Sequence, residues 1–152
     1  MSETTYRPEG QSFFVPALGS LYRSLDGLSE LVLRIAVGAL LIPHGLQKVG
    51  GFEGTAQFLA SVGFVPGGFW AALLILVEIG GGLALVLGAL TRPAAFAVFV
   101  FMLVAMWFHW SSGFFWTGGG WEYPALWAAA AFYFLIRGGG RYSVDRVLGR
   151  EI

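Results

Sequence analysis

The chain has 152 residues, of which 57% are hydrophobic and only 12% are charged. Soluble domains carry roughly 25% charged residues, so this surface is not built mainly for water. The formal net charge is zero, so the chain as a whole has no positive electrostatic field that would attract nucleic acid. The chain has no cysteine, which excludes disulfides, thiol–disulfide exchange and iron–sulfur ligation within it. We therefore expect an integral membrane protein that binds no nucleic acid.

Four apolar stretches are candidates for membrane-spanning helices. In chain order they are residues 28–47, 69–90, 93–110 and 121–136. A span needs about 20 apolar residues, so the second stretch fits best and the fourth is short. The sequence predicts an all-α membrane protein, a bundle of four transmembrane helices.

Basic residues in the connections set the expected orientation. Arginines precede the first stretch, separate the second from the third and follow the fourth, whereas the other side has only Lys48. Because cytoplasmic loops are enriched in Lys and Arg, we expect both termini in the cytoplasm. Residues 1–27 would form a cytoplasmic N-terminal segment, 28–137 the transmembrane domain, and 138–152 a basic tail that contacts anionic lipid. The N-terminus has no secretory-signal pattern.

Two connecting pieces have the pattern of short interfacial helices. Residues 13–27 are apolar with scattered charges and are expected to lie along the inner interface. Residues 53–62 repeat apolar side chains at helical spacing and are expected to lie on the outer leaflet. The loop 111–120 is rich in glycine and aromatic residues and is expected to fold over the outer end of the bundle.

Two ionisable residues lie inside the apolar stretches, Arg34 in the first and Glu78 in the second. A charge at mid-bilayer costs at least about 2.5–3.5 kcal/mol, so each needs a partner or a wet cavity. Helical rise from the outer ends places both near mid-membrane, where they are expected to form an ion pair and the catalytic centre. The alternative is that Arg34 pairs with Glu30 one turn away and reaches inward.

Glu78 itself has two interpretations. Gly81 and Gly82 share its helix face and allow another helix to approach closely, so the acid could serve helix packing alone. The functional interpretation is a proton or ligand site.

A second candidate site lies at the outer ends of the helices. His44 and His109 occupy corresponding depths, and Glu122 and Tyr123 begin the fourth stretch on that side, near Trp110. Histidines with a carboxylate could hold a metal or haem, but the spacing matches no ligand motif, so neither is expected. These side chains also have the chemistry to hydrogen-bond a quinone headgroup in an aromatic pocket.

Six short motifs, in order, resemble the DoxX family of small bacterial membrane proteins over residues 28–148. They are Pro43-His44-Gly45-Leu46-Gln47-Lys48, Glu78 with Gly81-Gly82, Gly88-Ala89-Leu90-Thr91-Arg92, Gly113-Phe114-Phe115-Trp116, Glu122-Tyr123 and Gly140-Arg141-Tyr142-Ser143-Val144-Asp145.

The resemblance implies a four-helix, multi-pass protein of the bacterial inner membrane, linked to respiratory or oxidative-stress chemistry. Relatives include the membrane subunit of thiosulfate:quinone oxidoreductase, and other members associate with soluble redox enzymes. The motif positions that it carries over are His44, Lys48, Glu78, Arg92, Glu122 and Tyr123.

Three functions are compatible with these features. The leading hypothesis is a quinone-linked redox subunit, with a partner redox protein and quinone as the cofactor. The second is a non-catalytic membrane anchor or assembly factor of a larger complex. The third is a small transporter or proton pathway. Contact with lipid is expected in each case, and self-association is plausible.

Overall fold

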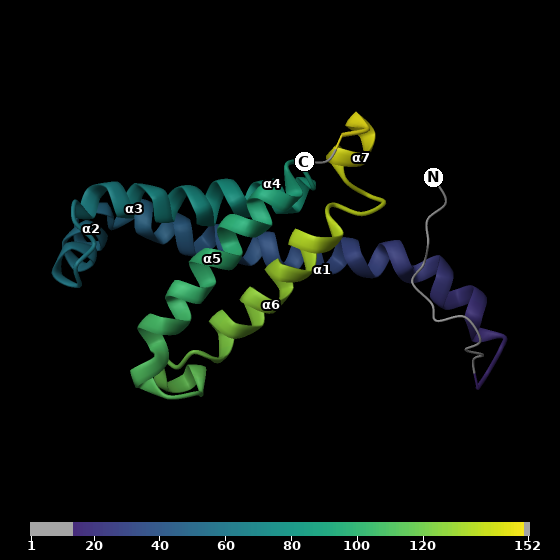
Figure 1. Cartoon of the computed structure of the whole chain (residues 1–152), viewed down its shortest axis with the longest axis horizontal. Coiled ribbons are helices and arrows are strands. Elements are labelled where there is room, and N and C mark those ends of the chain that lie inside the picture. The colour runs from purple at the N-terminus through teal and green to yellow at the C-terminus, as the bar shows by residue number, and fades with distance from the viewer. Residues whose placement is uncertain (1–13, 151–152) are drawn as a thin grey trace.

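A computed structural model describes residues 14–150, which are all-helical (Figure 1). The expected N-terminal segment lies outside this range up to residue 13, as do the last two residues of the expected tail. The helices are α1 (Leu18–Gly50), α2 (Phe52–Ser61), α3 (Gly67–Ile75), η1 (Leu76–Gly81), α4 (Gly82–Leu87), α5 (Thr91–His109), η2 (Trp110–Ser112), η3 (Trp116–Gly118), α6 (Glu122–Arg137) and α7 (Val144–Leu148).

Helix α1 is a single rod of 33 residues, about 50 Å long at the normal helical rise. It begins at Leu18, so the separate interfacial helix expected for residues 13–27 is not formed over its described part. The segment instead continues α1 beyond the rest of the bundle (Figure 1). The expected helix over residues 53–62 is confirmed as α2.

The second apolar stretch forms a continuous rod made of α3, η1 and α4, and η1 is a π-helical turn. Such wide turns are rare, and they are often found at functional sites. This rod runs beside α1, and the two backbones approach closely where Gly38 faces Gly82. A Cβ atom built on Gly38 would lie 2.5 Å from the Gly82 carbonyl oxygen. Only glycine allows this approach.

Helices α5 and α6 form an antiparallel hairpin that crosses the α1–α4 pair (Figure 1). Pro93 and Pro124 lie in the first turns of these helices, where a missing N–H costs nothing. We call the end of the bundle that holds α7 and residues 88–90 proximal, and the end that holds α2, η2 and η3 distal. The α1–α4 pair, which forms the first hairpin, and the α5–α6 hairpin meet at the proximal end and diverge toward the distal end (Figure 1).

The core joins all four rods and consists of apolar side chains. It contains Val37, Leu41, Leu85, Ala94, Ala95, Val98, Met102, Ala128, Ala131 and Phe134. Among residues 14–150, two helical segments are long and apolar enough to cross a membrane, Gly67–Leu87 and Thr91–Ser112. Large apolar side chains also cover the outside of the bundle, as at Leu76, Phe96 and Leu126. Such a surface suits lipid rather than water.

Candidate functional site

Glu78 forms an ion pair with Lys48 inside the bundle. The Lys48 Nζ donates to Glu78 Oε1 at 2.8 Å, which joins α1 to the π-helical turn η1. The Glu78 side chain is only 4% exposed, whereas that of Lys48 is 26% exposed. The pair therefore places a buried carboxylate behind a cation that reaches the surface.

The second carboxylate oxygen, Glu78 Oε2, is buried and has no hydrogen-bond partner among residues 14–150. Buried polar atoms are almost always paired, so such an exception is a candidate position for a ligand or a proton. The neighbouring position on α1 is Gly45, whose missing side chain makes room for Glu78. A Cβ atom built there would lie 3.0 Å from that of Glu78.

His44 belongs to the same centre. It lies one turn before Lys48 on α1, and the Lys48 Nζ also donates to the His44 carbonyl at 3.3 Å. His44 as a whole is exposed. Lys48, Glu78 and His44, three of the predicted site residues, thus come together.

The expected ion pair between Arg34 and Glu78 is wrong. The Arg34 guanidinium donates instead to the Gly139 carbonyl, and to the Tyr142 carbonyl at 2.5 Å. The reason is that the outer ends of the two stretches are not level, since Glu78 lies beside Gly45, close to the distal end of α1, and Arg34 lies farther toward the proximal end. Arg34 precedes Gly45, the neighbour of Glu78, by about 16 Å of helical rise.

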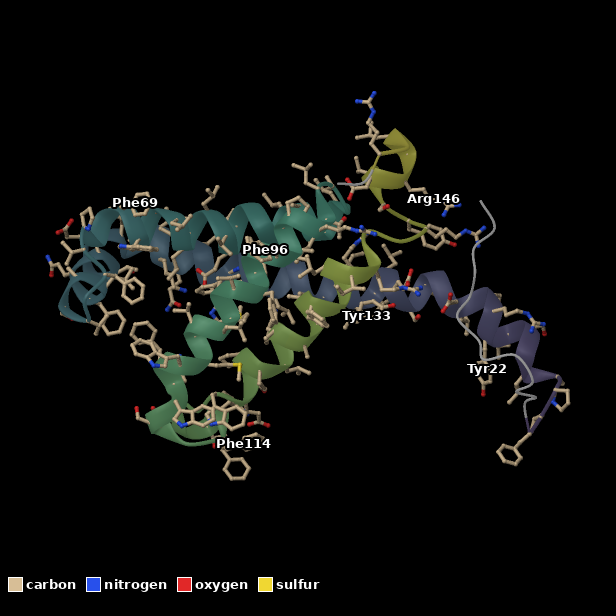
Figure 2. The ribbon with its side chains drawn as sticks, in the orientation of Figure 1. Tyr22, Phe69, Phe96, Phe114, Tyr133 and Arg146 are labelled. Atoms are coloured by element: carbon tan, nitrogen blue, oxygen red, sulfur yellow. The ribbon has the colours of Figure 1, made fainter. Side chains whose placement is uncertain are left out.

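The alternative partner of Arg34, Glu30, is also bound elsewhere. Glu30 accepts hydrogen bonds from Arg137 at 2.8 Å and from the Tyr133 hydroxyl at 3.0 Å. Figure 2 shows Tyr133 on α6 beside α1. These contacts fasten the last turns of α6 to α1.

Arg34 belongs to a proximal cluster built around Asp145. The Asp145 carboxylate accepts from the Leu90 N–H at 2.7 Å, and from the Thr91 N–H and hydroxyl at 2.9 and 2.7 Å. The Asp145 N–H donates to the Gly88 carbonyl at 2.9 Å. These bonds lock the segment after α6 onto the turn between α4 and α5.

The pKa of Asp145 lies below its usual value. Burial alone would raise this pKa, but the hydrogen bonds from Thr91 and Leu90 outweigh burial, and the positive charge of Arg34 acts in the same direction. Gly88 completes the turn with a φ of +66°, and a side chain there would overlap the Arg34 guanidinium. The turn therefore needs glycine at this position.

The remaining predicted site residues lie in a separate distal cluster. His109 Nδ1 is 2.6 Å from the Gly119 carbonyl oxygen, and Glu122 Oε2 accepts from the Trp116 N–H at 3.1 Å. The Tyr123 ring stacks on Trp116 with centroids 5.0 Å apart. Each of these contacts holds the loop that joins α5 to α6.

Trp110 is part of this distal cluster. Its ring stacks on Trp121 with centroids 5.1 Å apart, and Phe114 packs against Trp121. The loop thus folds on its own aromatic side chains. The expected convergence of His44 with His109, Glu122 and Tyr123 is wrong, because the hairpin that carries the latter three diverges from α1 toward the distal end (Figure 1).

An open cleft lies between the two diverging parts. Its volume is about 410 Å³, and its walls are Val62, Trp107, Phe108, Trp110 and Ser111. Phe108 also bridges the gap, with its ring 6.2 Å from that of Phe58 and 5.7 Å from that of Phe64. Over residues 14–150, no group of three or more His, Asp or Glu side chains is arranged to hold a metal.

Comparison with known proteins shows which family the sequence belongs to. The DoxX family model matches residues 29–110, which is more than half of the chain. The chain belongs to the DoxX family. The match ends before α6, although the proximal cluster depends on residues beyond it.

Three similar proteins from bacteria carry names that bear on location or chemistry. The inner membrane protein YqjF of Escherichia coli is 37% identical over 85% of this chain and 98% of its own length. The inner membrane protein YphA of the same organism is 38% identical over 47% of this chain and 50% of its own. CatD of Bacillus subtilis, provisionally named an oxidoreductase, is 37% identical over 43% of this chain and 47% of its own. No solved structure matches.

The sequence reasoning missed the proximal cluster as a unit. Thr91 and Asp145 each lie in one of the family-like motifs, but their order along the chain does not show that the two motifs contact each other in the fold. A signal was present, because both motifs follow helices predicted to end on the same side. Motifs that share a side and carry complementary hydrogen-bonding groups are candidates for contact.

Proposed function

We propose that this DoxX-family chain crosses the bacterial inner membrane four times, through α1, the α3–η1–α4 rod, α5 and α6. The apolar exterior of the bundle and the similarity to two inner membrane proteins support this. The basic residues at the proximal end favour a cytoplasmic location for that end. Lipid then covers the exposed apolar flanks.

We further propose that the chain is a quinone-linked redox subunit whose centre is Glu78, Lys48 and His44. The observation that carries this is the buried, unpartnered Glu78 Oε2 beside the Lys48 ammonium. The Lys48 ammonium can donate to one quinone carbonyl, and Glu78 protonated at Oε2 can donate to the other, which is what a headgroup with two acceptor oxygens requires. The similarity to CatD, which is named an oxidoreductase, supports the same class of chemistry.

The residues around Glu78 fit a bound quinone headgroup. Glu78 and Lys48 would orient the headgroup. A bound quinone supplies two-electron, two-proton redox chemistry. Glu78 can hold one proton at Oε2, while a partner redox protein exchanges the electrons, since the chain has no cysteine for a cluster of its own.

The test is a titration of the purified protein in detergent with decylubiquinone, followed by tryptophan fluorescence. Wild type should show saturable binding. Glu78→Leu should weaken binding by about twofold to tenfold, because it removes the donor at Oε2 and a neutral hydrogen bond contributes about 0.5–1.5 kcal/mol. Glu53→Leu, an exposed position on α2, is the matched control. Unsaturable binding, or equal affinity in wild type and Glu78→Leu, would refute the proposal.

A second candidate function is a membrane anchor for a larger complex. The observation that favours it is the proximal extension of α1, where Leu18, Leu21 and Leu25 are exposed along one face. This part of α1 projects beyond the other helices (Figure 1). Native mass spectrometry would show a stoichiometric protein partner and no bound quinone if the anchor function holds.

A further inference from the structure

We propose that Glu78 is reached from the distal end of the bundle only, with Lys48 as the group that controls access. This inference rests on the proposed site at Glu78 and states from which side of the membrane that site is reached. The proposed four-span orientation serves only to name the two sides. Three observations support it: the loss of burial along α1 toward the distal end, an apolar layer between Glu78 and the proximal cluster, and the position of Lys48.

Burial along one face of α1 changes at the level of Glu78. Val37 and Leu41 are 6% and 2% exposed, and both belong to the core. Gly45, one turn farther and beside Glu78, is still buried, whereas His44 is exposed and Lys48 is partly exposed. The change coincides with the divergence of α5 and α6 from α1 toward the distal end (Figure 1).

Helix α5 shows the same gradient. Val98 is fully buried, Met102 is 7% exposed, and Met106 is only partly buried. The last residue of this face, His109, is exposed. The inward faces of both helices therefore open toward the distal end and close toward the proximal end.

The layer between Glu78 and the proximal cluster is dry. Leu85, Val98 and Ala131 are each fully buried, and all belong to one apolar core. The Gly38 and Gly82 backbones close the gap between α1 and α4 at this level. A proton needs a chain of polar groups or water, and an apolar layer at native density supplies neither. This layer argues against a continuous pathway across the membrane.

Lys48 is the connection between Glu78 and the surface. Its Nζ contacts the buried carboxylate at 2.8 Å, while its side chain is 26% exposed at the open side. When Lys48 turns away, the carboxylate faces the distal opening, and when it returns, the ion pair closes the site. His44 lies on the same face and is the other titratable side chain that acts on Glu78 from α1.

The absence of native cysteine makes a clean labelling test possible. Single variants His44→Cys, Leu41→Cys and Ser24→Cys place thiols on α1 at the distal opening, in the dry layer and at the proximal end. A membrane-impermeant maleimide is added to right-side-out and to inside-out vesicles. We expect His44→Cys to label from one side only, Ser24→Cys from the opposite side only, and Leu41→Cys from neither.

A second readout addresses Glu78 directly. A water-soluble carbodiimide should modify Glu78 only from the side that labels His44→Cys, as measured by mass spectrometry. Lys48→Ala should raise the rate of this modification several-fold, because the covering group is gone. If Leu41→Cys does not fold, Ala131→Cys tests the same layer.

Labelling of Leu41→Cys from either side, or modification of Glu78 from the side that labels Ser24→Cys, would overturn the inference. So would an unchanged rate of Glu78 modification in Lys48→Ala. If His44→Cys and Ser24→Cys exchange sides relative to the proposed orientation, the inference stands and the orientation is corrected. None of these readouts requires quinone, so failure here is distinguishable from failure of the proposed function.

Discussion

The carboxylate of Asp145 accepts two hydrogen bonds from Thr91, at 2.9 and 2.7 Å, across 54 positions of the chain. This contact joins the segment after α6 to the start of α5, and Arg34 of α1 lies beside it. Three parts of the chain that are distant in sequence therefore meet at one proximal point. We infer that this cluster sets how the two hairpins meet and so how far they diverge at the distal end.

Replacing Asp145 with asparagine should destabilise the protein. An amide presents an NH2 group where the carboxylate now accepts from N–H donors, which leaves buried groups unpaired. We expect a loss of about 2–3 kcal/mol in the free energy of unfolding, measured in detergent. Asp26→Asn is the control, since Asp26 is exposed on α1, and it should change little. Equal effects of the two substitutions would show that the proximal cluster contributes nothing.

The stability of the protein should also depend on pH through Asp145. Its pKa is lower in the folded state than the unfolded value of about 3.9, so its stabilising effect is complete above that value. The effect is lost as the pH falls through the folded pKa. Between pH of about 5 and 2, the melting temperature of wild type should therefore fall more steeply than that of Asp145→Asn. Parallel curves would contradict the assigned role of the carboxylate.

The close approach of α1 and α4 predicts a strong effect at Gly38. A methyl group there would lie 2.5 Å from the Gly82 carbonyl oxygen, so Gly38→Ala must push the helices apart. Overpacking of this kind costs about 1–3 kcal/mol. Gly54→Ala on α2 meets no atom within 4 Å and should be neutral or slightly stabilising. Thermal unfolding of both variants is the measurement, and similar melting temperatures would count against the packing seen here.

Much of the helical order could be predicted from the sequence, because long apolar runs bounded by glycine and proline leave few alternatives. The expected stretch 69–90 is the α3–η1–α4 rod, and the stretch 93–110 is α5. The π-helical turn at Leu76–Gly81 could not be predicted, since no local pattern distinguishes it from an α-helix. Its presence depends on how the rod packs against its neighbours.

The site was harder to predict, because depth was counted from an assumed helix end. Apolar composition does not show that the outer ends of the two stretches are offset, so that Glu78 lies beside Gly45 near the distal end of α1. This error placed Arg34 beside Glu78, whereas Lys48 holds that position. In the sequence, only its motif indicates Lys48 as a site residue. The distal residues were grouped by depth alone, and the divergence of the hairpins separates them.

The ion pair between Lys48 and Glu78 is the central claim, and a double-mutant cycle tests it most directly. The free energies of unfolding of Lys48→Met, Glu78→Gln and the double variant give the coupling between the two side chains. A second cycle pairs Arg34→Met with Glu78→Gln. We expect a coupling of at least about 1 kcal/mol for Lys48 with Glu78, and additivity within about 0.5 kcal/mol for Arg34 with Glu78. Additivity in the first cycle together with coupling in the second would contradict the account.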